Sequence, residues 1–290
     1  AGAEVDGHRI RIPRELIRQL IKTVPEEFDY NARNPDRTVR VGGRNMIFGP
    51  AYGTPNVIDL DGVRRQATAD DMRTLMQLHH VNPAIHYNGG YTQEPMDVAV
   101  PHRHLHMVES SFLATDKPIM GSGQTEYQAQ DSLAMARIVF GEDFVDQNVV
   151  MTAFFNGNSP LVWDQSQLES MRVFAAANQA MLISPFVLYG ASTPVHILAG
   201  TAQVVAEAIA AIAFSQLIRP GCRALMGVAP MGVYMKTGSP TFGSPEVALM
   251  MYVFGQMARY YGVPWRTNGA KSGSKGDDLY AGYDSILKVY

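Results

Sequence analysis

The sequence predicts an α/β fold, and three features point to it. From residue 68 onward, apolar runs of strand length alternate with helical stretches that carry their own start and stop signals. Two of the runs, residues 149–155 and 183–189, are mostly apolar, as is typical of parallel strands buried on both faces. The 290 residues, 46% of them hydrophobic, suffice for one large core or two ordinary ones.

The first part of the chain has a different pattern. Residues 12–24 predict a helix with Pro13 near its start, where proline is well tolerated. Residues 39–53, rich in glycine and β-formers, and residues 56–62 predict antiparallel hairpins. We therefore expect a helix and β-hairpin extension over residues 1–66 and a domain of strand–helix units over residues 67–290.

Local signals place the later elements in order. Thr68 and Asp71 have the spacing of a capping box, and Ser244 followed by Pro245 is a strong helix start. We expect helices over residues 68–80, 102–114, 126–140, 199–218 and 244–262, with others opening at 164 and near 277. We expect strands at residues 84–87, 118–121, 149–155, 183–189, 224–228 and 263–267. About six units follow residue 80, whereas an eight-fold barrel needs eight, so the pattern allows an open sheet or a barrel that lacks its last units.

Composition excludes several classes of function. With 24 basic and 27 acidic residues the net charge is −3, which disfavours a nucleic-acid binder. The single Cys222 excludes an intrachain disulfide and a cysteine zinc site, and the histidines of residues 102–106 are expected on a partly exposed helix rather than around a metal. No apolar run approaches 18 residues and residues 1–14 lack a signal-peptide core, so we expect a cytoplasmic protein without a membrane span.

Candidate site residues follow the predicted strands, because loops at the carboxyl ends of parallel strands carry the chemistry in barrels and open sheets alike. Asn156 follows one buried strand, Tyr189 ends the next, and Tyr234 follows a third. With Tyr87 and Tyr91, these tyrosines can converge on one mouth. Aromatic faces with few charges suit a quaternary ammonium ligand through cation–π attraction. The alternative is that the rings only close the core.

Three charged residues complete the candidates. Lys271 lies among small residues after the last strand, either as a buried lysine capable of imine chemistry or as a solvated loop lysine. Glu207 lies within an apolar helix, either facing solvent or buried with a partner. Glu246 lies in a first turn that favours negative charge. We take Glu207 and Glu246 as supporting residues of the pocket.

Many short segments occur in an order that resembles the trimethylamine:corrinoid methyltransferase superfamily, which includes trimethylamine and glycine betaine methyltransferases. These segments are residues 61–65, 115–118, 158–161, 190–201, 216–221, 243–246, 258–262, 274–278 and 281–282. The resemblance implies a TIM-type (β/α)8 barrel. Because members of this superfamily continue well beyond the equivalent of Tyr290, it also implies that the last two strand–helix units lie outside this chain.

The resemblance also implies methyl transfer from a methylated amine to the Co(I) of a corrinoid protein. The corrinoid (a cobalamin) is then supplied by that partner, with no tightly bound cofactor and no metal site in this chain, and the enzyme is expected to be a homo-oligomer. Aligned on Lys275 and Asp278, the sequence places Lys271 at the position where trimethylamine enzymes carry pyrrolysine. At residues 272–273 it lacks the acid that follows a hydroxyl residue in the family.

These features favour a quaternary amine of the glycine betaine type as substrate. A quaternary ammonium already has a neutral leaving amine, whereas a tertiary amine needs the electrophilic imine that plain lysine lacks. Two alternatives are a trimethylamine methyltransferase with pyrrolysine at position 271 and a binder of methylated amines without catalytic activity.

Overall fold

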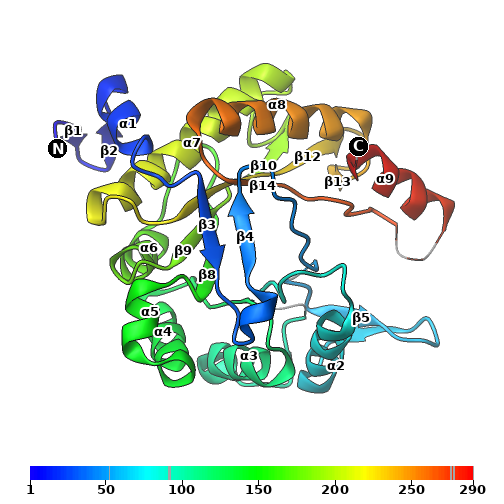
Figure 1. The fold of residues 1–290 in the computed structure, drawn as a ribbon. Helices are drawn as coiled ribbons and strands as arrows, with labels where there is room; N and C mark the ends of the chain where they lie inside the picture. The colour runs from blue at the N-terminus through cyan, green and yellow to red at the C-terminus, as the bar shows by residue number, and fades with distance from the viewer. Residues whose placement is uncertain (52, 91–92, 275, 277, 290) are drawn as a thin grey trace. The chain divides into compact units, whose positions relative to one another are not determined.

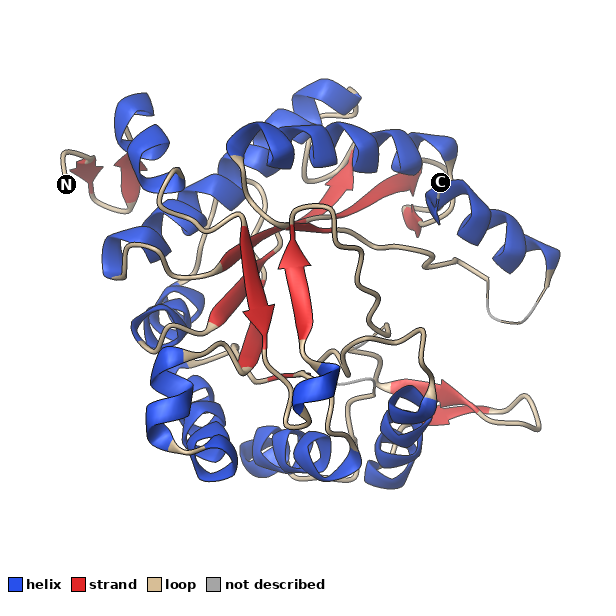
Figure 2. Cartoon of the chain, viewed as in Figure 1, coloured by secondary structure: helices blue, strands red, loops and turns tan. Residues whose placement is uncertain are grey.

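Residues 1–51, 53–90, 93–274, 276 and 278–289 are described by the computed structural model, and their architecture is α/β (Figures 1 and 2). The α-helices are α1 (Arg14–Ile21), α2 (Ala69–Val81), α3 (Val100–Ala114), α4 (Glu126–Phe140), α5 (Glu142–Gln147), α6 (Gln165–Ala176), α7 (Ile197–Ile218), α8 (Pro245–Tyr261) and α9 (Leu279–Val289). The strands from residue 119 onward are β7 (Ile119–Met120), β8 (Met151–Phe155), β9 (Ala180–Ile183), β10 (Phe186–Tyr189), β11 (Ala224–Gly227), β12 (Ala229–Tyr234), β13 (Ser239–Thr241) and β14 (Trp265–Arg266). Tyr91, Lys275 and Asp277, on which sequence predictions fall, lie outside the described residues.

The chain forms two compact units. The first unit comprises residues 1–26, 155–168 and 182–290, and the second comprises residues 27–154 and 169–181. Neither coincides with residues 1–66, whose division from the rest stays a prediction. The predicted N-terminal helix is confirmed as α1, and the predicted hairpins correspond to β3 (Glu27–Tyr30) with β4 (Val39–Gly42) and to β5 (Asn56–Ile58) with β6 (Arg64–Gln66). A further short hairpin pairs β1 (Glu4–Asp6) with β2 (Arg9–Arg11).

In the second unit the β3–β4 hairpin lies at the amino ends of two parallel strands. β7 pairs with β8 in parallel, and Tyr30 on β3 reaches the first residues of both. Its hydroxyl donates to the carbonyl of Ile119 and lies 3.0 Å from Thr152 Oγ1. Burial raises the pKa of Tyr30, so the hydroxyl stays protonated and keeps its hydrogen. The hairpin thus closes the amino ends of these strands.

One predicted strand of the second unit does not form. Residues 84–87 form no strand ladder. The backbone hydrogen bonds of residues 84–89 go to different segments of the chain, so no continuous pairing with one strand results. His86 N donates to Phe48 O, whereas Asn88 N donates to Pro118 O on the other side. Pro83, just before, has no N–H to extend either pairing. By contrast, the capping box at Thr68 and Asp71 is confirmed in full.

The first unit holds the strands that position the candidate site. β11 pairs with β14 in parallel, and a separate sheet has the order β10–β12–β13, with β10 parallel and β13 antiparallel to β12. The single strand predicted at residues 183–189 is interrupted, so β9 and β10 are separate, because Pro185 cannot donate to a ladder. The β12–β13 hairpin was not predicted from the sequence. α7 and α8 pack against each other, α7 against β10 and α8 against β12 (Figure 1).

By length and composition alone, α7 is long and apolar enough to cross a membrane. It was not identified from the sequence, where the criterion was an unbroken apolar run. Half of its most apolar window is buried in the fold. Core helices of globular proteins pass the same test, so this single helix is weak evidence for a span.

Lys117 is a buried lysine whose hydrogen bonds stabilise the second unit, and a substitution can test them. Its ammonium is buried and donates to His79 O, Asn82 O and Ile85 O at 2.7, 2.8 and 2.6 Å. It thereby closes the C-terminal end of α2, where the helix dipole favours a cation. Burial, and then the charge of Arg37, lowers its pKa.

We expect K117M to destabilise the fold by about 3 kcal/mol, because the methionine leaves three carbonyl groups without their donor. The control K22M replaces an exposed lysine and should change stability by less than about 0.5 kcal/mol. Urea denaturation followed by circular dichroism measures both. Equal urea midpoints for K117M and K22M would contradict the assigned role.

Candidate functional site

The candidate site consists of loops and strands of the first unit, each of which is hydrogen-bonded to the next. Residue 158 forms a parallel bridge with Phe186 of β10, and β10 continues into β12 and β13. The loop after β14 joins this series because Asn268 Nδ2 donates to Pro230 O on β12 at 3.4 Å. We call residues 156–163, β10, β12, β13 and residues 267–274 the strand-end rim.

Lys271 lies on the strand-end rim as an exposed cation resting on an aromatic ring. Its Nζ is 4.8 Å from the centroid of Phe242, which follows β13. This distance is that of a cation–π contact. Of the two sequence interpretations, the structure supports the loop lysine, because the side chain is exposed rather than buried. Its ammonium can meet a solute anion while the ring beneath holds it in place.

Of the tyrosines predicted to converge, Tyr189 and Tyr234 lie on one face of β10 and β12, whereas Tyr87 lies in the second unit beside Tyr30. Tyr189 is buried, its hydroxyl lies 3.0 Å from Thr201 Oγ1 on α7, and burial raises its pKa. Its ring packs so closely on Gly200 that an added Cβ there would come within 2.4 Å of it. Since Tyr189 pairs with Gly232, alternation along β12 puts Tyr234 on the same face, with its side chain 51% exposed. Contact of either ring with a substrate stays a prediction.

Glu207 of α7 is the best-defined polar residue in contact with the strand-end rim. Its side chain is 3% exposed, which decides between the two sequence interpretations in favour of a buried acid with partners. Oε2 accepts from Ser159 Oγ at 2.5 Å, and Oε1 accepts from Leu161 N and Gln203 Nε2, each at 2.9 Å. The indole N–H of Trp163 donates to the backbone carbonyl of Glu207 at 3.1 Å. One residue of α7 thus holds the whole loop that follows β8.

This anchoring explains the conformation of the loop. The Ser159–Pro160 peptide is cis, and Leu161 has φ 59°, in the left-handed region that costs an L side chain energy. The N–H of Leu161 is the group that donates to Glu207. A charged acceptor strengthens that bond and offsets the cost of the backbone conformation.

The other predicted residues have simpler places. Asn156 is half-buried at the end of β8, with its backbone N–H 3.3 Å from Gln167 Oε1. Glu246 is exposed in the first turn of α8, and hydrogen bonds from Ser244 and from its own backbone N–H lower its pKa. These contacts are those of a helix N-terminus. Whether Asn156 or Glu246 takes part in binding stays a prediction.

Two aromatic residues were missed by sequence reasoning. Phe242 supports Lys271 but lies in a short segment between an unpredicted strand and a helix start. Phe186 begins β10 with its side chain 52% exposed, and alternation places it on the face opposite Tyr189. Its exposure was hidden by the continuous apolar run that contains it. The half-exposed aromatic side chains of the strand-end rim therefore include Phe186 as well as Tyr234.

The remaining candidates for chemistry have structural partners. His104 is buried in α3 with Nε2 2.8 Å from Asp131 Oδ2, and in the described part of the chain no three potential ligand side chains gather into a metal site. Cys222 is buried, its thiol lies 3.1 Å from Gln216 Nε2, and burial raises its pKa. These features do not indicate a reactive thiol.

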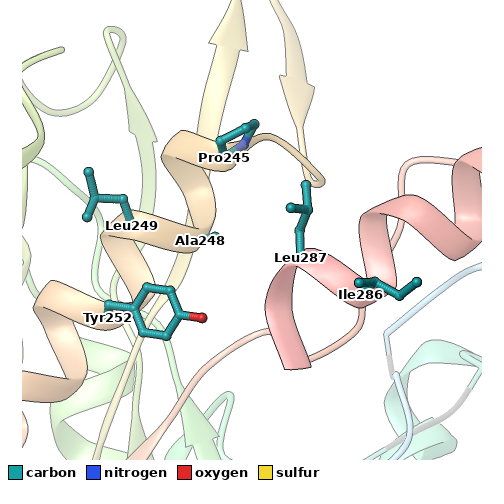
Figure 3. Close-up of a pocket in the computed structure, with 6 residues that line it drawn as sticks. All are labelled: Pro245, Ala248, Leu249, Tyr252, Ile286 and Leu287. Atoms are coloured by element: carbon teal, nitrogen blue, oxygen red, sulfur yellow. The ribbon is translucent and has the colours of Figure 1, made fainter. Parts of the chain in front are cut away.

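An open apolar groove of about 440 Å³ separates α8 from α9 (Figure 3). Its walls come from both helices and consist of Pro245, Ala248, Leu249, Tyr252, Ile286 and Leu287. The groove contains no charged group, and it lies between two helices rather than at the strand ends. We assign no chemistry to it.

The comparisons with known proteins agree with one another. The family described as trimethylamine methyltransferase (MTTB) matches residues 1–290. A glycine betaine methyltransferase of Desulfitobacterium hafniense (strain Y51) is 38% identical over 99% of this chain and 60% of its own length. A proline betaine:corrinoid methyltransferase and an L-carnitine:corrinoid methyltransferase of Eubacterium limosum are each 24% identical over the same shares. The chain therefore spans about 60% of the length of these relatives.

A solved structure has a similar fold. The crystal structure of the hydroxylamine MtmB complex matches 97% of this chain and 67% of its own chain, with a TM-score of 0.61 and 9% identity. At that identity the match speaks for the fold alone. It agrees with the α/β architecture and the parallel strand pairs described above.

Removal of the Glu207 carboxylate should release the loop that it holds. We expect E207A to cost about 3 kcal/mol and to raise hydrogen exchange in residues 156–163, because three donors lose their acceptor. The isosteric E207Q keeps an acceptor for Leu161 and Gln203 and should cost less. Urea denaturation and exchange mass spectrometry measure the two effects. Unchanged protection of the loop in E207A would show that the loop is held by other contacts.

Proposed function

Since the chain belongs to the trimethylamine methyltransferase family, we propose that the protein transfers a methyl group from a quaternary amine of the glycine betaine type to the Co(I) of a corrinoid protein. The family match over residues 1–290 supports methyl transfer from a methylated amine. Two named relatives act with a corrinoid, which supports a partner protein that supplies it. The cobalt is then a co-substrate and not a cofactor resident in this chain.

The observation that carries the choice of substrate is the pair formed by Lys271 and Phe242. A betaine has a quaternary ammonium and a carboxylate in one small molecule. The exposed Lys271 ammonium, held over Phe242, is suited to the carboxylate. The half-exposed ring of Tyr234 is suited to the methylated ammonium, whereas Phe186 lies on the opposite face of the sheet. The names of three relatives, for glycine betaine, proline betaine and L-carnitine, agree with a substrate of this kind.

The proposed reaction requires few chemical groups from this chain. Co(I) supplies the electron pair that forms the new cobalt–carbon bond, and the carbon–nitrogen pair departs with the amine, which leaves neutral. No proton has to move, so the protein's task is to orient one methyl group in line with its acceptor and to exclude water. A buried anchor such as Glu207, which fixes a loop without exposing charge, serves that task.

The finer features of the whole protein follow from the same family membership. We infer that the parallel strands belong to a TIM-type barrel, that the protein is cytoplasmic and that it assembles as a homo-oligomer. Pyrrolysine at position 271 and a binding protein without turnover are the alternatives, and the assay below separates them from the proposal.

The full-length protein should methylate a reduced Co(I) corrinoid protein with glycine betaine and not with trimethylamine. Absorbance of the corrinoid reports the transfer. Turnover with trimethylamine, together with a mass for the Lys271 peptide above that of lysine, would establish the pyrrolysine enzyme instead. Tight betaine binding without any transfer would establish a binding protein.

The variant K271M should raise the KM for glycine betaine by about tenfold or more, because the carboxylate loses a charged partner. Tetramethylammonium, which lacks a carboxylate, is the matched probe, and its inhibition constant should change little. Initial rates of corrinoid methylation measure the first and competition the second. Equal losses for both ligands would show that Lys271 does not read the carboxylate.

A further inference from the structure

The segment on either side of Lys271 is tied to two consecutive residues of α9. Ser285 Oγ donates to Ala270 O at 3.2 Å, just before the lysine. Asp284 Oδ2 accepts from Ser272 Oγ at 2.8 Å and from Gly273 N at 3.0 Å, just after it. The backbone on both sides of Lys271 is therefore fixed by one turn of helix.

The carboxylate of Asp284 also touches the segment beneath the lysine. Asp284 is fully buried, and its Oδ1 has no hydrogen-bond partner among the described residues. A Cβ added to Gly243 would lie 1.5 Å from that oxygen, so the carboxylate occupies the space a side chain at 243 would fill. Gly243 follows Phe242, the ring on which Lys271 rests. One side chain thus touches the segments that directly follow Lys271 and Phe242.

Stability alone gives a weak reason for an acid here. Burial of a carboxylate is costly unless it is paired, and the described residues form no ion pair with Asp284. One of its oxygens accepts no hydrogen bond from any residue that the structure describes. The open groove beside α9 also leaves the helix without close apolar packing along that side (Figure 3). A polar anchor that sets geometry accounts for these features together.

We infer that Asp284 is a positioning residue, which holds Lys271 over Phe242 so that the ammonium meets the substrate carboxylate. The inference rests on the proposed function for the identity of that carboxylate. The position of Lys271 over the ring is independent of any activity.

The first measurement is spectroscopic. In full-length protein with 13C-dimethylated lysines, the Lys271 signal, identified by its loss in K271R, should be displaced by the ring current of Phe242. D284A and G243A, which remove or displace the carboxylate, should move this signal to the position of exposed lysines. D284N keeps one acceptor for Gly273 N–H and should restore much of the displacement. A281G, which weakens α9 through helix propensity alone, should leave the signal in place.

The second measurement is kinetic. D284A should raise the KM for glycine betaine by about tenfold, as K271M does, with a smaller change in kcat. The double variant D284A/K271M should show no further rise, because both changes remove one interaction. D284N should recover part of the loss, whereas A281G should leave KM unchanged.

The outcomes distinguish the positioning role of Asp284 from the proposed function. If no betaine is turned over but D284A still moves the Lys271 signal, the proposed function fails and the positioning role stands. If D284A and D284N leave the signal in place, or if A281G moves it equally, the positioning role is overturned whatever the activity.

Discussion

Loops that leave the carboxyl ends of strands expose backbone N–H groups that no ladder satisfies, and two buried carboxylates solve this problem in the first unit. Glu207 of α7 accepts from Leu161 N and two side chains, and Asp284 of α9 accepts from Gly273 N and one side chain. In both cases a side chain of a helix reaches into the loop that follows a strand. These two acids therefore fix two of the loops of the strand-end rim.

The two anchors differ in what they leave unsatisfied. Each oxygen of Glu207 has at least one donor, so the loop after β8 is fixed by a complete set of bonds. Asp284 has one oxygen with two donors and one with no partner in the described residues. A fully satisfied group rigidifies its surroundings, whereas a partly satisfied one carries an energetic cost that needs another explanation. The position of Lys271 provides that explanation.

Much of the fold could be predicted because its signals are local. Thr68 with Asp71 and Ser244 mark helix starts through hydrogen bonds within one turn, whereas Pro13 does so through its restricted backbone, and the structure confirms each helix. Strands were harder to predict because pairing partners lie far apart in sequence. Residues 84–87 have strand-like side chains, but their hydrogen bonds go to different segments. β12 pairs with β10, whose residues lie 43 positions earlier in the sequence (Phe186 with Ala229).

The candidate site was predictable only in part, for the same reason. The strand-end rule led to Lys271, Asn156 and the tyrosines, but burial decided between the interpretations of Lys271 and Glu207, and burial is a tertiary property. Nothing local marks Asp284, an acid in the middle of a helix, or Phe242 as neighbours of Lys271.

The exposure of Lys271 bears on the reaction itself. Lysines that form imines are activated by burial, which favours the neutral amine, and Lys271 lies in contact with solvent instead. An exposed ammonium over a ring can offer its charge to an anion. Under the proposed function, such a charge distinguishes a zwitterionic methylated amine from a purely cationic one, because it attracts the carboxylate of the first and repels the second. We therefore propose that Lys271 selects the substrate through its ammonium and not through imine chemistry.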